Sequence, residues 1–150
     1  MHVLQLNCVM VSMIVQFTWS AMTPRILIAD DDDDLRLLLR LMLSREGFEV
    51  IEAANGTEAL ARAYDSHPTL VLLDVMMPDI DGFEVCRQLR SDERTQRLPI
   101  VFVSALDDIT QRNEMLKLGA DDCLRKPIGP RDLIARVRGV MERRGLIPVA

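Results

Sequence analysis

Short apolar runs alternate with helix-like segments along most of this chain. The runs are continuous, as at residues 26–29 and 70–73, and polar residues do not alternate within them. Strands of that kind are typical of a parallel sheet covered on both faces. Because each run is followed by apolar residues at helical spacing, the pattern predicts a doubly wound α/β sandwich. A chain of 150 residues is long enough to bury such a core in one domain.

The expected elements fall within residues 25–143, and residues 144–150 form a short tail. We expect strands at about residues 26–29, 49–53, 70–73, 100–103 and 123–125. We expect helices at about residues 34–45, from Asn55, after Gly82, at about 108–118 and from Pro130. The run at 70–73 is the most hydrophobic of the strands, so we place it at the centre of the sheet.

The first expected helix carries many leucines and follows a run of aspartates. Its inner face is expected to be formed by Leu35, Leu38, Leu39 and Met42. An aspartate at the start of a helix commonly caps the free backbone N–H groups of the first turn. We therefore expect Asp33 or Asp34 to be the N-cap.

Residues 1–24 contain no Asp, Glu, Lys or Arg. A signal peptide would need a basic region at its start, and none is present. A membrane anchor would need about 20 mostly apolar residues, whereas polar residues interrupt this stretch. We favour an uncharged upstream extension without a core function, either disordered or an overlong start with Met22 as the working start. A membrane anchor and an ordered extra element remain open.

The net charge of −5 argues against nonspecific binding to nucleic acid or anionic lipid, which favour cationic surfaces. The three cysteines, Cys8, Cys86 and Cys123, have no metal-ligand spacing and fit a reducing cytosol. We therefore expect a cytoplasmic protein without a disulfide framework. The five consecutive carboxylates at residues 30–34 form a local concentration of charge that needs its own explanation.

Polar side chains follow four of the five expected strands. Asp30 and Asp31 follow the first, Asp74 the third, Ser104 the fourth and Lys126 the fifth. The carboxyl ends of parallel strands share one edge of the sheet, where α/β proteins place their sites. We therefore expect these five side chains to lie close together.

This set suits phosphoryl chemistry that depends on a divalent cation. Three converging carboxylates repel one another, and a hard cation removes that repulsion. Mg²⁺, or Mn²⁺ in its place, prefers oxygen ligands of this kind. With the cation bound, a carboxylate can act as the nucleophile toward a phosphoryl group. An ammonium and a hydroxyl nearby would hold the remaining phosphoryl oxygens.

Four motifs carry a resemblance to a known family. ILIADD, LVLLDVMMPDIDG, VFVSA and LRKP occur in this order between Ile26 and Pro127. Together they resemble the receiver domains of two-component response regulators over about residues 25–143. The resemblance implies a flavodoxin-like fold, with a five-stranded parallel sheet in the order 2-1-3-4-5 and five helices.

The resemblance also implies roles for individual residues around the metal. Asp74 matches the aspartate that is phosphorylated. Asp31 matches the direct Mg²⁺ ligand, and Asp30 matches its partner. Met76 would offer the metal its backbone carbonyl.

Further positions match residues that respond to the phosphoryl group. Ser104 matches the switch hydroxyl, and Lys126 matches the lysine that pairs with the phosphoryl group. The bond before Pro127 is expected to be cis, as X–Pro bonds can be. Cys123 departs from the family, which usually has Tyr or Phe at this second switch position. Without that ring, the signal is expected to pass through the helix at about 107–119, or the switch is expected to be weak.

A receiver domain implies partners. We expect a sensor histidine kinase or phosphotransfer protein to donate the phosphoryl group. Because only residues 144–150 follow the domain, we expect no output module and no direct contact with nucleic acid or membrane. The signal would reach a downstream protein, or a homodimer, through the face formed by about residues 108–142.

Two other functions are weighed against this one. A pseudo-receiver would act as an unphosphorylated scaffold, and the intact acidic set argues against it. A phosphatase with an aspartyl-phosphate intermediate, similar to haloacid dehalogenases, would carry a second aspartate two residues after the nucleophile. That position is Met76, so no general acid is available for turnover.

Overall fold

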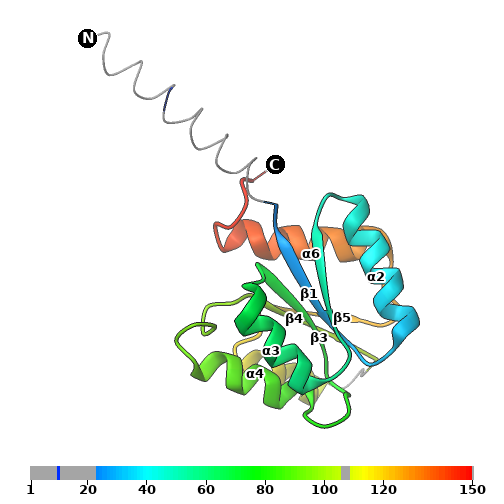
Figure 1. Ribbon diagram of the computed structural model, residues 1–150, viewed down its shortest axis with the longest axis vertical. Coiled ribbons are helices and arrows are strands. Elements are labelled where there is room, and N and C mark those ends of the chain that lie inside the picture. Colours follow the sequence, from blue (N-terminus) through cyan, green and yellow to red (C-terminus); the bar gives the residue numbers. More distant parts are fainter. Residues whose placement is uncertain (1–9, 11–22, 106–108, 150) are drawn as a thin grey trace.

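The protein is a five-stranded parallel sheet between two layers of helices (Figure 1). The computed structural model describes residues 10, 23–105 and 109–149. The strand order is β2-β1-β3-β4-β5, so the predicted fold class and strand order are confirmed. The strands are β1 (Arg25–Ala29), β2 (Glu49–Ala53), β3 (Leu70–Asp74), β4 (Ile100–Ser104) and β5 (Asp122–Arg125).

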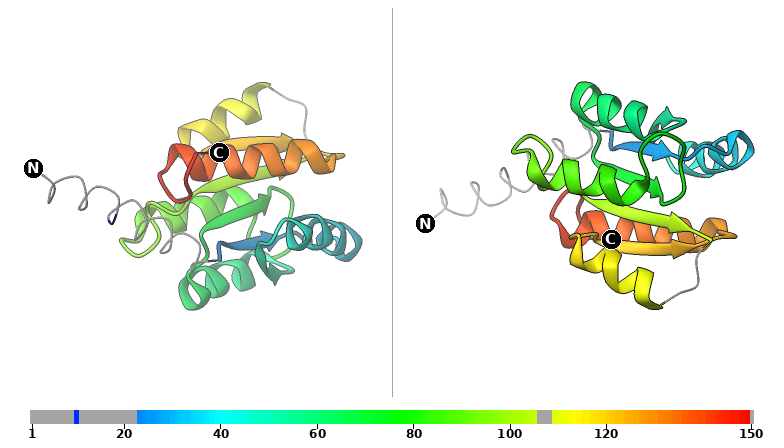
Figure 2. Two further views of the ribbon diagram at one scale, coloured as in Figure 1. Left: turned by 90° about the horizontal axis from the view of Figure 1, so that it is seen from above. Right: turned by 90° about the horizontal axis from the view of Figure 1, so that it is seen from below.

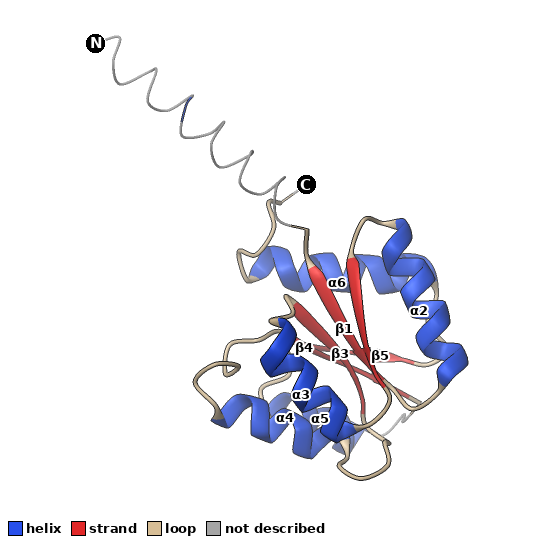
Figure 3. Cartoon of the chain, viewed as in Figure 1, coloured by secondary structure: helices blue, strands red, loops and turns tan. Residues whose placement is uncertain are grey.

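Helices cover both faces of the sheet, as Figures 2 and 3 show. They are α2 (Asp33–Arg45), α3 (Gly56–Ser66), α4 (Gly82–Ser91), α5 (Ile109–Lys117) and α6 (Pro130–Arg143). Apolar residues of α2 and α6 pack in one core cluster, and those of α3, α4 and α5 pack in the other. The bounds lie close to the expected ones, although residue 108 of the expected fourth helix lies outside the described residues.

Successive residues of a strand face opposite layers, which explains the continuous apolar runs in the inner strands β1, β3 and β4. Leu72 lies in the cluster beneath α2 and α6, whereas Leu73 lies in the cluster beneath α3, α4 and α5. All five residues of β3 are buried, and this strand is the middle one, as predicted. The apolar residues Leu70 to Leu73 of β3 therefore pack in both cores, and the strand ends at the sheet edge with Asp74.

The start of α2 differs from the prediction. The N-cap is Asp32, and its side chain accepts hydrogen bonds from the backbone N–H groups of Asp34 and Leu35 at 3.0 and 3.2 Å. The prediction of Asp33 or Asp34 was wrong because both already lie within the first helical turn. In that turn, the positive end of the helix dipole stabilises the negative charges of Asp33 and Asp34.

The inner face of α2 also differs from the predicted one. Leu39 and Leu43, four residues apart, are buried on the same face of the helix. Leu35 and Met42 pack against this core in partly buried positions. Leu38 was wrongly predicted to be buried, since it is 46% exposed at the edge of the helical face.

The chain continues to pack after α6. The backbone N–H of Leu146 donates to the carbonyl of Met141 at 2.8 Å. Leu146 and Ile147 contact the core cluster beneath α2 and α6. At the other end, the expected extension at residues 1–24 lies mostly outside the described residues. In the part of the chain that the structure describes, no helix has the length and apolar character needed to cross a bilayer.

Candidate functional site

Three predicted carboxylates converge at the carboxyl ends of β1 and β3. Oxygen atoms of Asp30, Asp31 and Asp74 lie within 4.8 Å of one another. Asp30 and Asp74 are only 2% and 5% exposed, whereas Asp31 is exposed to solvent. The sheet edge therefore holds two buried carboxylates and one through which a cation could approach from solvent.

Lys126, from the residues after β5, reaches into the same group. Its Nζ lies 2.9 Å from Oδ2 of Asp30 and 3.4 Å from Oδ1 of Asp74. Only 22% of the Lys126 side chain is exposed. The ammonium thus partly balances the buried negative charge, and the structure brings together four of the predicted site residues.

The residues after β1 are held by contacts that the sequence did not reveal. Oδ1 of Asp30 accepts a hydrogen bond from the backbone N–H of Asp32 at 2.9 Å. The guanidinium of Arg36 donates to the backbone carbonyl of Asp30 at 2.6 Å. Asp30 and Asp31 therefore lie in a turn that the first part of α2 fixes. The contact of Arg36 with Asp30 has no sequence signal, because the acceptor is a backbone atom.

The loop between β3 and α4 is closely packed against the backbone of Asp74. The N–H of Gly82 donates to the carbonyl of Val75 at 2.8 Å. A Cβ on Gly82 would lie 2.1 Å from the carbonyl oxygen of Asp74, so only glycine fits here. Farther along the loop, Asp79 has a φ of 68° and accepts hydrogen bonds from the N–H groups of Gly56 and Thr57, at the start of α3. The loop after Asp74 is thus fixed to two helices.

The remaining predicted residues lie around this edge. Ser104 ends β4, is 4% exposed, and its carbonyl accepts a hydrogen bond from the N–H of Lys126 at 2.9 Å. The bond between Lys126 and Pro127 is cis. Cys123 is half-buried, lies opposite Phe102 in the β4–β5 register and packs against the core cluster beneath α3, α4 and α5.

Met76 contributes through its backbone. Its N–H donates a hydrogen bond to the Asp74 carboxylate, while its side chain is 69% exposed. The role of its carbonyl as a metal ligand remains a prediction, and so do the roles assigned to the other site residues.

The electrostatics of the site favour a cation. Burial and the nearby charge of Asp30 raise the pKa of the Asp74 carboxyl to about 6, although Lys126 opposes the shift. Burial lowers the pKa of Lys126, but its hydrogen bond to Asp30 and the charges of Asp74 and Asp30 outweigh this, so the pKa lies above its ordinary value. One ammonium therefore does not fully compensate the two buried carboxylates.

One buried atom supports the fit to a metal ion. Oδ2 of Asp30 is buried, and the Lys126 ammonium, 2.9 Å away, is its one partner among the described residues. Buried carboxylate oxygens normally accept hydrogen bonds or bind metal. Three converging carboxylates, two of them buried and sharing one ammonium, match the oxygen ligands that Mg²⁺ prefers. Asp30, Asp31 and Asp74 therefore fit a Mg²⁺ or Mn²⁺ ion.

Binding of Mg²⁺ is expected to weaken in acid, because a proton on Asp74 competes with the cation. With a pKa of about 6, this carboxyl is mostly protonated at pH 5. The apparent affinity should then be about tenfold lower than at pH 7.5. Isothermal titration at the two pH values measures this ratio. Asp74→Asn should bind more weakly but show a much smaller ratio, and an undiminished ratio would exclude Asp74 as the group responsible.

Comparison with known proteins decides the family. The family model of the response regulator receiver domain matches residues 26–138, most of the chain. The chain belongs to this family. The resemblance carried by the four motifs is thereby confirmed, and receiver domains are signalling modules of two-component systems that generally bind Mg²⁺ at acidic residues like these.

Similar proteins include both longer regulators and isolated receivers. "Probable transcriptional regulator ycf27" of Galdieria sulphuraria is 46% identical over 119 residues, which is 79% of this chain and 46% of that protein. The chain thus spans about half the length of such curated relatives. A crystal structure of a response regulator from Chloroflexus aurantiacus J-10-fl has 38% identity and a TM-score of 0.78, covering 81% of this chain and all of that one. The BeF3-activated DrrB receiver domain has 30% identity and a TM-score of 0.73, and the match covers 81% of this chain and 100% of that one.

Proposed function

We propose that this receiver accepts a phosphoryl group on Asp74 from a sensor histidine kinase or a phosphotransfer protein. The observation that carries the proposal is the convergence of Asp30, Asp31 and Asp74 within 4.8 Å, with Lys126 in contact with two of them. A buried carboxylate beside a cation site and an ammonium is the arrangement that phosphoryl transfer to an aspartate requires. The protein's chemistry would be limited to gaining and losing this group.

The transfer step follows from the positions of these groups. An oxygen of the Asp74 carboxylate attacks phosphorus, and the bond from phosphorus to the donor nitrogen breaks as the acyl phosphate forms. Mg²⁺ held by Asp30, Asp31, Asp74 and the Met76 carbonyl would neutralise phosphoryl charge. The Lys126 ammonium would pair with one phosphoryl oxygen and the Ser104 hydroxyl would donate to another.

Phosphorylation would change the partners of Lys126. Its ammonium now contacts Asp30 at 2.9 Å and Asp74 at 3.4 Å, and a phosphoryl group on Asp74 would draw it away from Asp30. Because Lys126 follows β5 directly, such a shift would reach the face made by α5, β5 and α6. We propose that this face, at about residues 108–142, contacts a downstream protein or a second copy in the cytoplasm. Cys123 would occupy the place of the second switch residue without an aromatic ring.

Beryllium trifluoride, which mimics an aspartyl phosphate, tests the proposal. With Mg²⁺ and beryllium trifluoride the melting temperature should rise by about 5 °C or more, since only the folded site binds the mimic. Asp74→Asn should not respond, because it lacks the carboxylate that bonds beryllium. A wild-type protein that binds Mg²⁺ but shows no such rise would favour the pseudo-receiver instead.

A further inference from the structure

A second hollow lies at the opposite end of the sheet from Asp74. Its volume is about 570 Å³, within the range of small-molecule sites. Thr69 and Pro99, which line it, directly precede β3 and β4, whereas Asp74 and Ser104 end those strands. The length of a five-residue strand, about 16 Å, separates the two places. The hollow is therefore distinct from the phosphorylation site.

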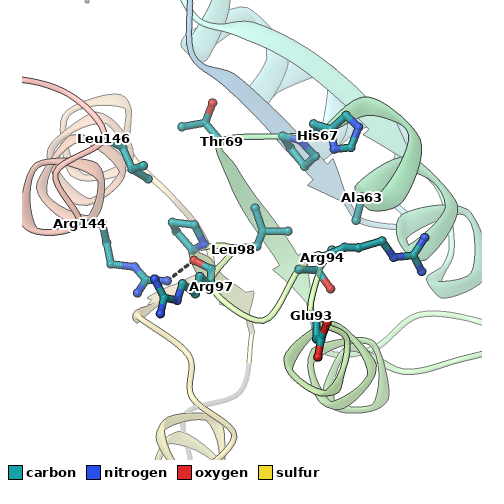
Figure 4. Close-up of a pocket in the computed structure, with 12 residues that line it drawn as sticks. Ala63, His67, Thr69, Glu93, Arg94, Arg97, Leu98, Arg144 and Leu146 are labelled. Carbon is teal, nitrogen blue, oxygen red and sulfur yellow. Dashed lines mark hydrogen bonds between the residues drawn. The ribbon is translucent and has the colours of Figure 1, made fainter.

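The lining includes three arginines, Arg94, Arg97 and Arg144, in a protein whose net charge is −5. Glu93 is the one acidic residue of the lining. His67 lies across the cavity from Arg144 and Arg97 in Figure 4. The lining thus offers several N–H donors and few acceptors, which suits an anion.

Two of the arginines are held in place by other residues. Arg144 pairs with Asp121 at 3.2 Å and donates a hydrogen bond to the backbone carbonyl of Arg97. Arg94 pairs with Asp92 at 2.7 Å and stacks on the ring of Tyr64. Neither aspartate lines the cavity. The contacts of Arg144 fix its donors at the cavity at little conformational cost to a ligand. The contacts of Arg94 instead direct its guanidinium away from the cavity (Figure 4), toward Tyr64.

Arg97 differs from the other two arginines. Its side chain is exposed and forms no hydrogen bond or ion pair with the described residues. The backbone carbonyl of Arg97 accepts a hydrogen bond from the guanidinium of Arg144, so the two arginines lie next to each other at the cavity. Asp121 balances the charge of Arg144, whereas Arg97 has no counter-charge among the described residues, so an anion beside Arg97 would be attracted.

The rest of the lining is apolar. Ala63, Pro68, Leu98, Pro99 and Leu146 supply this part of the surface. Leu146 is held there by the hydrogen bond from its N–H to Met141 and by packing against the core. An apolar surface beside several guanidinium groups fits a ligand with a flat apolar body and an anionic end.

We propose that this cavity binds a nucleoside phosphate, with the phosphate groups on Arg97 and Arg144 and the base against the apolar residues. Phosphate oxygens match the forked N–H donors of arginine. The base would cover Leu98 and Leu146, which otherwise contribute apolar surface to an open hollow. The proposal does not depend on phosphorylation of Asp74, because no residue is shared between the two places.

Isothermal titration with ADP, in EDTA to keep Mg²⁺ from the aspartate site, tests the assignment. Wild type and Asp74→Asn should both bind ADP saturably, with a dissociation constant of about 1 mM or lower. Arg97→Gln should weaken binding about tenfold without lowering the melting temperature, since this side chain has no structural partner. The matched control Arg112→Gln, at an exposed arginine on α5, should bind as the wild type does.

Four outcomes would overturn the proposal. The first is a failure of ADP to saturate the wild type at 10 mM, and the second is an Arg97→Gln variant that binds ADP as tightly as the wild type. The third is pyrophosphate binding as tight as that of ADP, which would show that the apolar residues contribute nothing and would exclude the nucleoside. Adenosine alone should bind much more weakly than ADP, and equal binding would exclude the arginines as the anchor.

Discussion

Gly82→Ala is expected to lower the stability of the protein by about 3 kcal/mol, the upper range for forcing extra atoms into a packed region. The added Cβ would lie 2.1 Å from the carbonyl oxygen of Asp74 and 2.9 Å from the Cα of Val75. These are backbone atoms of Asp74 and its neighbour, so no side-chain rotation relieves the overlap. The melting temperature should fall by about 10 °C, and the surviving folded protein should accept phosphoryl groups more slowly.

Gly139→Ala is the matched control for this substitution. Gly139 lies within α6, and its added Cβ would meet only the end of the flexible Arg143 side chain, at 3.4 Å. Alanine in a helix interior gives a more stable folded state than glycine by roughly 0.5–1 kcal/mol. The Gly139→Ala variant should therefore melt at the same temperature as the wild type or higher. Thermal unfolding of both variants measures the difference. Equal melting temperatures for the two would contradict the close approach of Gly82 to Asp74.

Lys126→Ala is expected to change metal binding and phosphoryl uptake in opposite directions. The ammonium lies 2.9 Å from Asp30 and 3.4 Å from Asp74, where it competes with a cation for the same carboxylates. Its removal should therefore tighten Mg²⁺ binding. Uptake from a small phosphodonor should fall by roughly a hundredfold, because a charge partner of the developing phosphoryl oxygens is lost.

Lys117→Ala controls for the loss of a positive charge. Lys117 is exposed near the end of α5 and is the other lysine of the chain. This variant should keep both the Mg²⁺ affinity and the rate of uptake. Isothermal titration measures the Mg²⁺ affinity, and the rate of mass gain measures phosphoryl uptake. A Lys126→Ala variant that bound Mg²⁺ more weakly would show that the lysine supports the metal site and does not compete with it.

The fold could be predicted because its strands carry strong local signals. Strand β3 is buried on both faces and is apolar from Leu70 to Leu73, and glycines and prolines mark the ends of the elements around it. The convergence of Asp30, Asp31 and Asp74 followed from the same pattern, since parallel strands end at a common edge. The sequence therefore predicted the carboxylate cluster before any distance was known.

Contacts between distant parts of the chain could not be predicted. The Asp79 carboxylate accepts a hydrogen bond from the N–H of Gly56, which lies 23 residues earlier. The Arg36 guanidinium donates a hydrogen bond to the backbone carbonyl of Asp30. Such bonds from side chain to backbone leave no periodic pattern. The exposed position of Leu38 depends on how α2 is rotated on the sheet, which its many leucines left ambiguous. The arginine-lined cavity is built mostly from loops, and the sequence of a loop has no periodic pattern that predicts how it is arranged.

The central claim is that Asp74 is the group that takes the phosphoryl group. Intact mass after incubation with Mg²⁺ and a small phosphodonor tests it most directly. The wild type should gain about 80 Da, the mass of one phosphoryl group, and Asp74→Asn should gain nothing. An equal gain in Asp74→Asn, or none in a folded, Mg²⁺-binding wild type, would contradict the claim.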